Sequence, residues 1–373
     1  MSDAATMPMP ALSEALPDLR LGYVPLTDAA PLLVAAERGM FRRHGLKIDL
    51  TAAGSWSALR DRVAAGIWHG GQMLGPMPIA CYFGLGQAQA NLTVTATLGR
   101  NGNTLVLSNR LIAEIGACDW PLSPSRLATA LAVRLAAGQS APVLAVVFPF
   151  SSHNYLLRHW LASAGIDPER DVRLVVLPPS LLPEALADGR IDGFCAGEPW
   201  GSRAVDLEVG QILLSSRHIW PNHPEKVLAF TDRTLARDPA PAIAATAAVI
   251  EAAAWLGQPE NRAEAASILH RAGLSDVPEA VIALALDEQL IRAPGEAATP
   301  MHGAILHGAT ATRPDPAHAA WWLRAMRRWG HLPAGDNAVL DQWQPHLWQR
   351  AAELTVFGPI APLTDQPPHF RRI

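Results

Sequence analysis

The chain has 373 residues, 49% of them hydrophobic, so it can bury a large core and form two or perhaps three compact units. Thirty basic and 34 acidic side chains give a formal charge of −4, which provides no broad attraction to nucleic acid or to an anionic membrane surface. No stretch approaches the roughly 20 apolar residues of a membrane-spanning helix. Composition therefore excludes a disordered chain and an integral membrane protein, and any anion site has to be local.

The cysteines and the first residues are compatible with a reducing compartment. Cys81, Cys118 and Cys195 are odd in number and far apart, so they suggest neither a disulfide framework nor a CxxC metal site. Residues 1–18 contain three prolines and no lysine or arginine, and they lack the basic, apolar and cleavage regions of an export signal. We expect a flexible leader and a cytoplasmic protein.

Strands and helices alternate along the first two thirds of the chain. Apolar spacing predicts strands at residues 19–24, 47–51, 71–74, 92–98 and 104–108, with helices at 29–44, 56–65 and 78–84. After a segment with a helical pattern at 127–137, a second unit is predicted, with strands at 143–148, 172–177 and 193–196 and helices at 153–165 and 180–188. This alternation predicts an α/β fold with mainly parallel sheets covered on both faces.

From about residue 239 the pattern becomes entirely helical. Alanine-rich helices are predicted at residues 241–256, 263–272 and 278–290. In the following tryptophan-rich segment, Trp322, Met326 and Trp329 share one helical face. A packed helical core explains these tryptophans, and a partner-binding surface is the alternative.

Common enzyme motifs are missing. The sequence contains no GxxxxGK loop, no GxGxxG, no GxSxG and no HExxH. We therefore expect a binding protein with no catalytic residue, no cofactor and no metal site.

Four local stretches resemble the nitrate- and bicarbonate-binding (NrtA/CmpA-like) branch of the periplasmic binding proteins, and also the cytoplasmic nitrate and nitrite sensors of the NasS type. They are GYVPLTDAAP at 22–31, GSW at 54–56 with MLGPMP at 73–78, HNY at 153–155 with CAGEPW at 195–200, and HPEK at 223–226. The resemblance implies a type II periplasmic-binding-protein fold, in which two α/β lobes joined by a hinge enclose the ligand. NasS is the expected nearest relative.

The resemblance also implies a division of the chain into lobes. Residues 1–18 are expected to form the leader, 19–109 with about 232–350 lobe 1 and its C-terminal helical extension, 110–231 lobe 2, and 351–373 a tail.

By this resemblance, Trp56, His153 and Lys226 match the positions that enclose the anion. Asn103 matches an amide position, although it is shorter than the glutamine expected there. Gly197 belongs to the pocket, and Pro76 is expected to shape its wall. Lys226 favours nitrate or nitrite over bicarbonate, because the bicarbonate branch is expected to carry an acid there, with a calcium ion.

Glu198 is expected to act indirectly, since a carboxylate facing a bound anion would repel it. Its expected role is to orient His153, Lys226 or a backbone group, or to help lock the hinge.

Each of these residues also has a simpler structural interpretation. Trp56 would pack between sheet and helix, and His153 would be a helix cap or core residue. Lys226 would form a solvated pair with Glu225, worth under about 1 kcal/mol.

Three functions are compatible with this pattern. The leading hypothesis is a cytoplasmic sensor that binds nitrate or nitrite and controls an RNA-binding antiterminator of the NasT type, without itself contacting nucleic acid or membrane. The second is the substrate-binding subunit of a nitrate or bicarbonate ABC transporter. The third is an enzyme resembling the pyrimidine synthase of thiamine biosynthesis, which needs a cysteine cluster that three dispersed cysteines do not supply.

Overall fold

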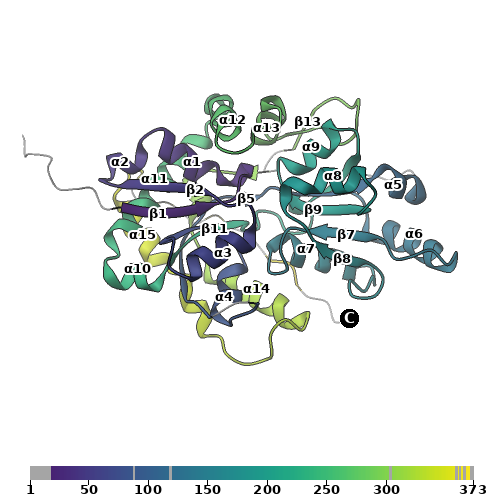
Figure 1. Ribbon diagram of the computed structural model, residues 1–373, viewed down its shortest axis with the longest axis horizontal. Coiled ribbons are helices and arrows are strands. Elements are labelled where there is room, and N and C mark those ends of the chain that lie inside the picture. The colour runs from purple at the N-terminus through teal and green to yellow at the C-terminus, as the bar shows by residue number, and fades with distance from the viewer. Residues whose placement is uncertain are drawn as a thin grey trace, which may run out of the picture.

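Two α/β lobes lie side by side along the long axis of the molecule (Figure 1). The computed structural model describes residues 18–86, 89–116, 120–301, 305–357, 360, 363 and 367–369. Residues 1–17 of the expected leader, and Cys118, lie outside the described residues. A five-stranded sheet forms the centre of each lobe. The predicted division into two α/β units is confirmed.

The sheet of lobe 1 has the strand order β2-β1-β3-β11-β4. Its strands are β1 (Asp18–Tyr23), β2 (Lys47–Ala52), β3 (Gly70–Leu74), β4 (Leu92–Thr97) and β11 (Lys226–Thr231). β1 pairs in parallel with β2 and β3, whereas β11 runs antiparallel to β3 and β4. Every residue of β3, β4 and β11 is buried, so helices and loops cover both faces of this half of the sheet.

The sheet of lobe 2 has the order β10-β6-β9-β7-β8. Its strands are β6 (Asn103–Ser108), β7 (Val143–Val146), β8 (Arg173–Val176), β9 (Gly193–Gly197) and β10 (Gly210–Ser215). β7 pairs in parallel with β8 and β9, and β6 runs antiparallel to β9 and β10. Each sheet is therefore mainly parallel, as expected, with one antiparallel strand that was not expected, β11 in lobe 1 and β6 in lobe 2.

The antiparallel strand of each sheet is the one that enters from the other lobe. After β4 the chain forms the short strand β5 (Arg100–Asn101) and enters lobe 2 as β6, and it returns after β10 into lobe 1 as β11. The sheets therefore place the lobe boundaries one strand earlier than the expected 109/110 and 231/232. An apolar pattern identifies a strand, but it does not identify the sheet in which that strand pairs.

Helices cover both sheets. Those before the returning strand are α1 (Ala30–Glu37), α2 (Met40–Arg43), α3 (Trp56–Ala64) and α4 (Met77–Tyr82) in lobe 1, and α5 (Asn109–Ile115), α6 (Pro124–Ala136), α7 (Ser152–Ala162), α8 (Leu182–Ala187) and α9 (Trp200–Asp206) in lobe 2. The helix predicted at 29–44 is divided, because Gly39 takes a φ of 66° between α1 and α2.

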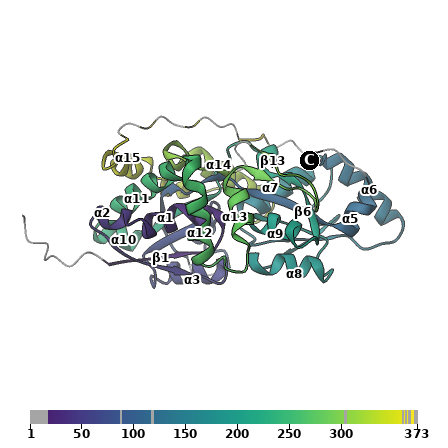
Figure 2. The same cartoon turned by 90° about the horizontal axis from the view of Figure 1, so that it is seen from above.

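The C-terminal part is mainly helical and covers both lobes. Its elements are α10 (Asp232–Arg237), α11 (Ala240–Leu256), α12 (Arg262–Arg271), α13 (Glu279–Leu286), α14 (Pro316–Arg328) and α15 (Pro345–Glu353), with the short strands β12 (Gln289–Leu290), β13 (Thr299–Pro300) and β14 (Ile305–Leu306). α11 packs on α1 and β4 of lobe 1, whereas α13 contacts α9 and α14 contacts α7 of lobe 2 (Figure 2). The extension is therefore not confined to lobe 1.

Short 3₁₀ helices lie at several turns. Those in the described residues are η1 (Thr27–Ala29), η2 (Pro179–Leu181), η3 (Ser216–His218), η4 (Pro259–Asn261), η5 (Ala309–Thr312) and η6 (Ala338–Gln342). η1 and η3 are important for the site because they flank the junction of the lobes.

The tryptophans of α14 belong to the core. Trp321 and Trp322 are buried, and their ring centroids lie 5.0 and 5.6 Å from that of Trp220, which precedes β11. Met326 is also buried, and Trp329 is partly buried. Of the face predicted from spacing, Trp322 thus packs against the segment that returns to lobe 1, and Met326 is buried with it.

No single helix of the described residues is long and apolar enough to cross a membrane. α11 and residues 259–271 reach the necessary length and hydropathy only together, as a pair bent by 101°.

β1 and β3 approach each other closely at Gly22 and Gly71. A Cβ atom on Gly71 would lie 2.3 Å from the carbonyl oxygen of Gly22, a backbone atom that cannot move away without shifting β1. We expect Gly71→Ala to lower the free energy of unfolding by roughly 3 kcal/mol, measured by urea denaturation. Gly54→Ala is the matched control, since a Cβ there meets nothing within 4 Å. Equal stability of the two variants would contradict this packing.

Candidate functional site between the lobes

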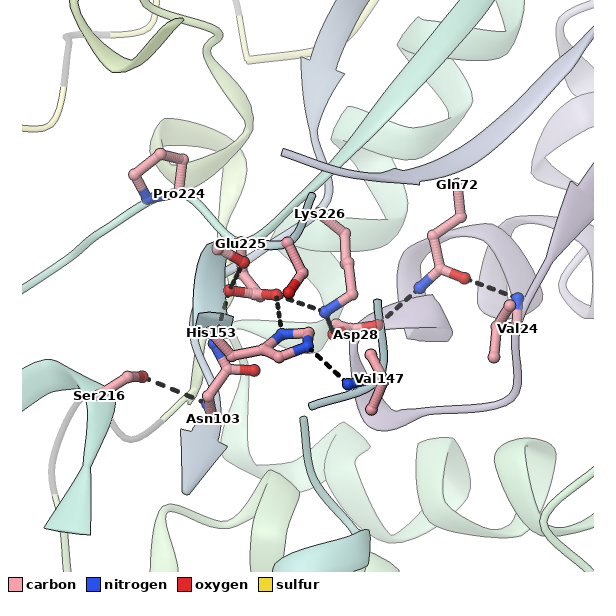
Figure 3. Close-up of polar contacts among 12 residues, drawn as sticks. Val24, Asp28, Gln72, Asn103, Val147, His153, Ser216, Pro224, Glu225 and Lys226 are labelled. Atoms are coloured by element: carbon pink, nitrogen blue, oxygen red, sulfur yellow. Dashed lines mark hydrogen bonds and ion pairs between the residues drawn. The ribbon is translucent and has the colours of Figure 1, made fainter. Parts of the chain in front are cut away.

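The two crossing strands begin at the junction of the lobes, and their first residues are polar. Asn103 opens β6 and Lys226 opens β11, and both side chains are fully buried. Each strand starts where it enters its new lobe, so these residues meet at the junction although they are far apart in sequence. Figure 3 shows the polar cluster that surrounds them.

The Lys226 ammonium is held by two carboxylates. Its Nζ atom lies 2.7 Å from Oδ2 of Asp28 and 2.5 Å from Oε1 of Glu225, and 5.5 Å from the ring centroid of Trp56. Burial acts to lower the pKa of Lys226, but attraction to Asp28 and Glu225 outweighs it and raises that pKa. The ammonium therefore stays charged. Because Lys226 and Glu225 are both 0% exposed, the interpretation as a solvated pair is wrong.

Glu225 is the most highly connected side chain of the cluster. Its Oε2 atom accepts a hydrogen bond of 2.6 Å from Nδ2 of Asn103 and another from the hydroxyl of Ser152. Burial raises the pKa of Glu225, but Lys226 and the neighbouring imidazole of His153 more than reverse this and lower it. The carboxylate is therefore ionised.

Asp28 is anchored from lobe 1. Gln72 donates from Nε2 to Oδ1 of Asp28 at 2.6 Å, and the Gln72 carbonyl accepts from the backbone N–H of Val24 at 2.8 Å. Sequence reasoning did not select Asp28, Gln72 or Glu225 as site residues. An available signal was Asp28 itself, an acid within an otherwise apolar stretch, which requires a buried partner.

His153 lies at the start of α7, directed at Glu225. The N-cap of this helix is Ser151, whose hydroxyl accepts from the N–H of Asn154 at 3.2 Å, so His153 is not the cap. Nε2 of His153 accepts from the backbone N–H of Val147 at 3.3 Å, which leaves the proton on Nδ1, 3.8 Å from Oε1 of Glu225. Burial lowers the pKa of His153, so the imidazole is neutral.

Trp56 is the first residue of α3, and Ser55 caps that helix. Three buried polar atoms in the cluster lack a hydrogen-bond partner among the described residues: Nε1 of Trp56, Nδ1 of His153 and Oδ1 of Asn103. The first two are N–H donors. Buried donors without partners are rare in folded proteins, and here they border the ammonium of Lys226. An oxygen-rich anion would satisfy them.

Gly197 and Pro76 lie in the walls of the junction. Gly197 pairs with Asn103 in register, and a Cβ on it would lie 3.4 Å from Oδ2 of Asp28, so the glycine permits close approach of lobe 1. Pro76 precedes α4 and follows Gly75, whose N–H donates to the backbone carbonyl of Glu225 at 3.0 Å. Pro76 is thus placed beside the cluster and contributes shape.

Glu198 connects the lobes without bonding to Lys226 or His153. Its carboxylate accepts from the hydroxyl of Thr104 at 2.8 Å and from the N–H of Ser202 at 3.1 Å. Its backbone carbonyl accepts from both the N–H and the hydroxyl of Thr27, at 2.9 and 2.8 Å, across the junction. Of the expected roles, the geometry agrees with those of orienting a backbone group and joining the lobes.

His223 extends the cluster along the returning segment. The Ser216 hydroxyl accepts from the N–H of Asn103 at 3.3 Å and donates to Nε2 of His223 at 2.8 Å. Nδ1 of His223 then carries the proton and donates to the carbonyl of Pro224 at 3.0 Å. This side chain was also missed from the sequence, although it lies in the HPEK stretch.

The arrangement is suited to binding. It supplies an ammonium, an amide, a hydroxyl and two ring N–H groups in a buried junction, with donors from both lobes. Among the described residues, no group of three or more His, Cys, Asp or Glu side chains is placed to hold a metal ion.

Stability is expected to fall in mild acid. Burial lowers the pKa of His223 from 6.5 to about 4. Below pH 6.5 this histidine therefore binds a proton in the unfolded chain but not in the folded one. From pH 7 to pH 5 this costs about 2 kcal/mol of unfolding free energy, at about 1.4 kcal/mol per pH unit below 6.5. Urea denaturation at both values measures it. His223→Gln, which does not titrate, should show a smaller loss; an unchanged loss would contradict this assignment.

Comparison with known proteins gives consistent matches. Residues 13–270 match the NMT1-like family. The nitrate import ATP-binding protein NrtC of Synechocystis is 39% identical over 250 residues, which are 66% of this chain but only 36% of NrtC, so this chain spans about a third of that relative. The bicarbonate-binding protein CmpA of Synechococcus is 32% identical over 355 residues, with 90% of this chain and 78% of CmpA covered.

A solved structure agrees with the fold. The crystal structure of the periplasmic nitrate-binding protein NrtA from Synechocystis superposes with a TM-score of 0.83 at 28% identity, covering 90% of this chain and 88% of NrtA. This confirms the predicted periplasmic-binding-protein fold. The chain belongs to the NMT1-like family and, within it, to the group of nitrate- and bicarbonate-binding proteins that includes NrtA and CmpA.

Proposed function

We propose that this protein encloses nitrate or nitrite between its lobes and acts as a cytoplasmic sensor that controls a NasT-type RNA-binding antiterminator. The observation that carries the binding part is a fully buried ammonium, Lys226, at a junction where both lobes supply hydrogen-bond donors.

The donor set suits a small planar anion. Nitrate is singly charged and weakly hydrated, so one ammonium with a few neutral donors balances the loss of its water better than a dense cluster of arginines. The lysine, placed where an acid and a calcium ion would serve bicarbonate, favours nitrate or nitrite. NrtA, which superposes on this chain, is by its title a nitrate-binding protein.

Sensing follows from the position of the site. An anion that bonds to donors of both lobes binds the closed form more tightly than the open form, and it shifts the population by that difference. A partner that recognises only the open form would then be released by the anion.

The second candidate is the substrate-binding subunit of a nitrate or bicarbonate transporter. It is favoured by the likeness to NrtA and CmpA, which are by name binding proteins of nitrate and bicarbonate. An enzyme of the thiamine-pyrimidine synthase type is less favoured, because Cys81 in α4 and Cys195 in β9 lie in different lobes. These two cysteines form no cluster.

Isothermal titration with nitrate, nitrite, bicarbonate and an aliphatic sulfonate tests the ligand. We expect micromolar or tighter binding of nitrate, weakened at least tenfold in His153→Ala and Lys226→Ala, since a lost hydrogen bond to a charged group costs about 1.5–3 kcal/mol. Val133→Ala, on an exposed part of α6, is the control and should bind like the wild type. Bicarbonate binding that requires calcium would refute the choice of ligand.

The sensor is tested with a purified NasT-type antiterminator. Size-exclusion chromatography should show a complex without nitrate and separate proteins once nitrate saturates the site. Fractionation of cells that express the native gene is the complementary measurement. Recovery of the protein from the periplasm would favour the transporter subunit instead.

A further inference from the structure

The Glu225 carboxylate lies where the donors of the junction converge (Figure 3). It accepts from Nζ of Lys226 at 2.5 Å, from Nδ2 of Asn103 at 2.6 Å and from the hydroxyl of Ser152. Nδ1 of His153 lies 3.8 Å from Oε1, on the same side as the ammonium. Lys226 belongs to lobe 1, while Asn103, Ser152 and His153 belong to lobe 2, so this one group bonds to both lobes.

A carboxylate has the chemistry of the proposed ligand. Like nitrate and nitrite it is planar, carries one negative charge, and accepts hydrogen bonds through oxygen atoms held in one plane. Its partners include Lys226 and Asn103, and it faces His153; these are three of the residues that resemblance assigns to the anion.

We propose that Glu225 is an internal stand-in for the anion: its carboxylate takes up the donors of the junction when no anion is bound, and nitrate or nitrite binds by displacing it. This inference rests on the proposed function and adds to it a residue that sets affinity and selectivity.

The charge of the cluster requires displacement. With both imidazoles neutral, the Glu225 carboxylate already balances the positive charge of Lys226 in a buried space, and Asp28 adds no positive charge. A second anion on the same donors would place like charges in contact. Nitrate and nitrite have no hydrogen to share with a carboxylate, so they cannot bind beside it.

Bicarbonate differs in this respect, because its O–H group can donate to the Glu225 carboxylate. Bicarbonate therefore still displaces the carboxylate from the donors, but it keeps Glu225 as a hydrogen-bond partner, which offsets part of the repulsion between the two charges. Glu225 therefore discriminates between anions with and without a hydrogen to donate. It also lowers the affinity for nitrate.

Only the side chain of Glu225 has to move. Its N–H donates to the carbonyl of Gly99 at 3.2 Å, and its carbonyl accepts from the N–H of Gly75 at 3.0 Å, so its backbone is fixed at the junction. A flexible side chain joins the carboxylate to this fixed backbone. Rotation about its own side-chain bonds suffices to free Lys226, Asn103 and Ser152.

Titration calorimetry of two matched variants tests the proposal. Glu225→Gln keeps the shape and removes the charge, and we expect it to bind nitrate at least tenfold more tightly than the wild type, with no gain for bicarbonate. Glu184→Gln is the matched control: it makes the same change at an exposed acid of α8 outside the cluster, and it should bind nitrate like the wild type. Thermal melts followed by circular dichroism establish that both are folded.

The outcomes separate this inference from the proposed function. Nitrate binding by the wild type without a gain in Glu225→Gln, or with an equal gain in Glu184→Gln, overturns the stand-in role alone. Absence of anion binding in all three proteins overturns the proposed function and this inference with it.

A second measurement uses acetate as the probe. Glu225→Ala should bind acetate at least tenfold more tightly than the wild type, because the small carboxylate fills the vacated position. Equal acetate binding by a folded Glu225→Ala protein would also overturn the proposal.

Discussion

The buried ammonium of Lys226 is the interaction on which the junction depends. It is fully enclosed between Asp28 of lobe 1 and Glu225 of the returning segment, and it is tolerated there because both carboxylates neutralise it at hydrogen-bonding distance. Removing one partner of such a buried group costs about 3–5 kcal/mol, because a charge is left unpaired. The remaining polar side chains arrange themselves around this charge: Gln72 holds Asp28, while Asn103 and Ser152 hold Glu225.

The topology explains why these groups meet. In each sheet the strand that arrives from the other lobe runs antiparallel to its neighbours and begins at the junction. Its first residue is therefore presented to the opposite lobe, which is the position of Asn103 in β6 and of Lys226 in β11. A site built on two strand starts is rigid within each lobe, and only the relation between the lobes changes.

Much of the fold was predictable from the sequence, and the site only in part. Local patterns predicted most strands and helices within a few residues, because apolar periodicity is a property of neighbouring positions. No strand was predicted at β10 or β11. Pairing across lobes cannot be recognised from local sequence, so the residues of β6 were assigned to lobe 1 and those of β11 to lobe 2. Trp56, Asn103, His153 and Lys226 do converge. Glu225 was not predicted as a site residue because a Glu-Lys dipeptide is usually solvated. Its burial becomes evident only in the folded structure.

The C-terminal helices have a mechanical consequence for the lobes. α13 contacts α9 and α14 contacts α7, both in lobe 2, while α11 and α12 before them and α15 after them pack on lobe 1. One continuous segment is thus fastened to both lobes at several points, beside the indoles of Trp220 and Trp322. The extension is therefore a further link between the lobes beside their crossing strands. Separating the lobes requires breaking the contacts of α13 or α14 with lobe 2.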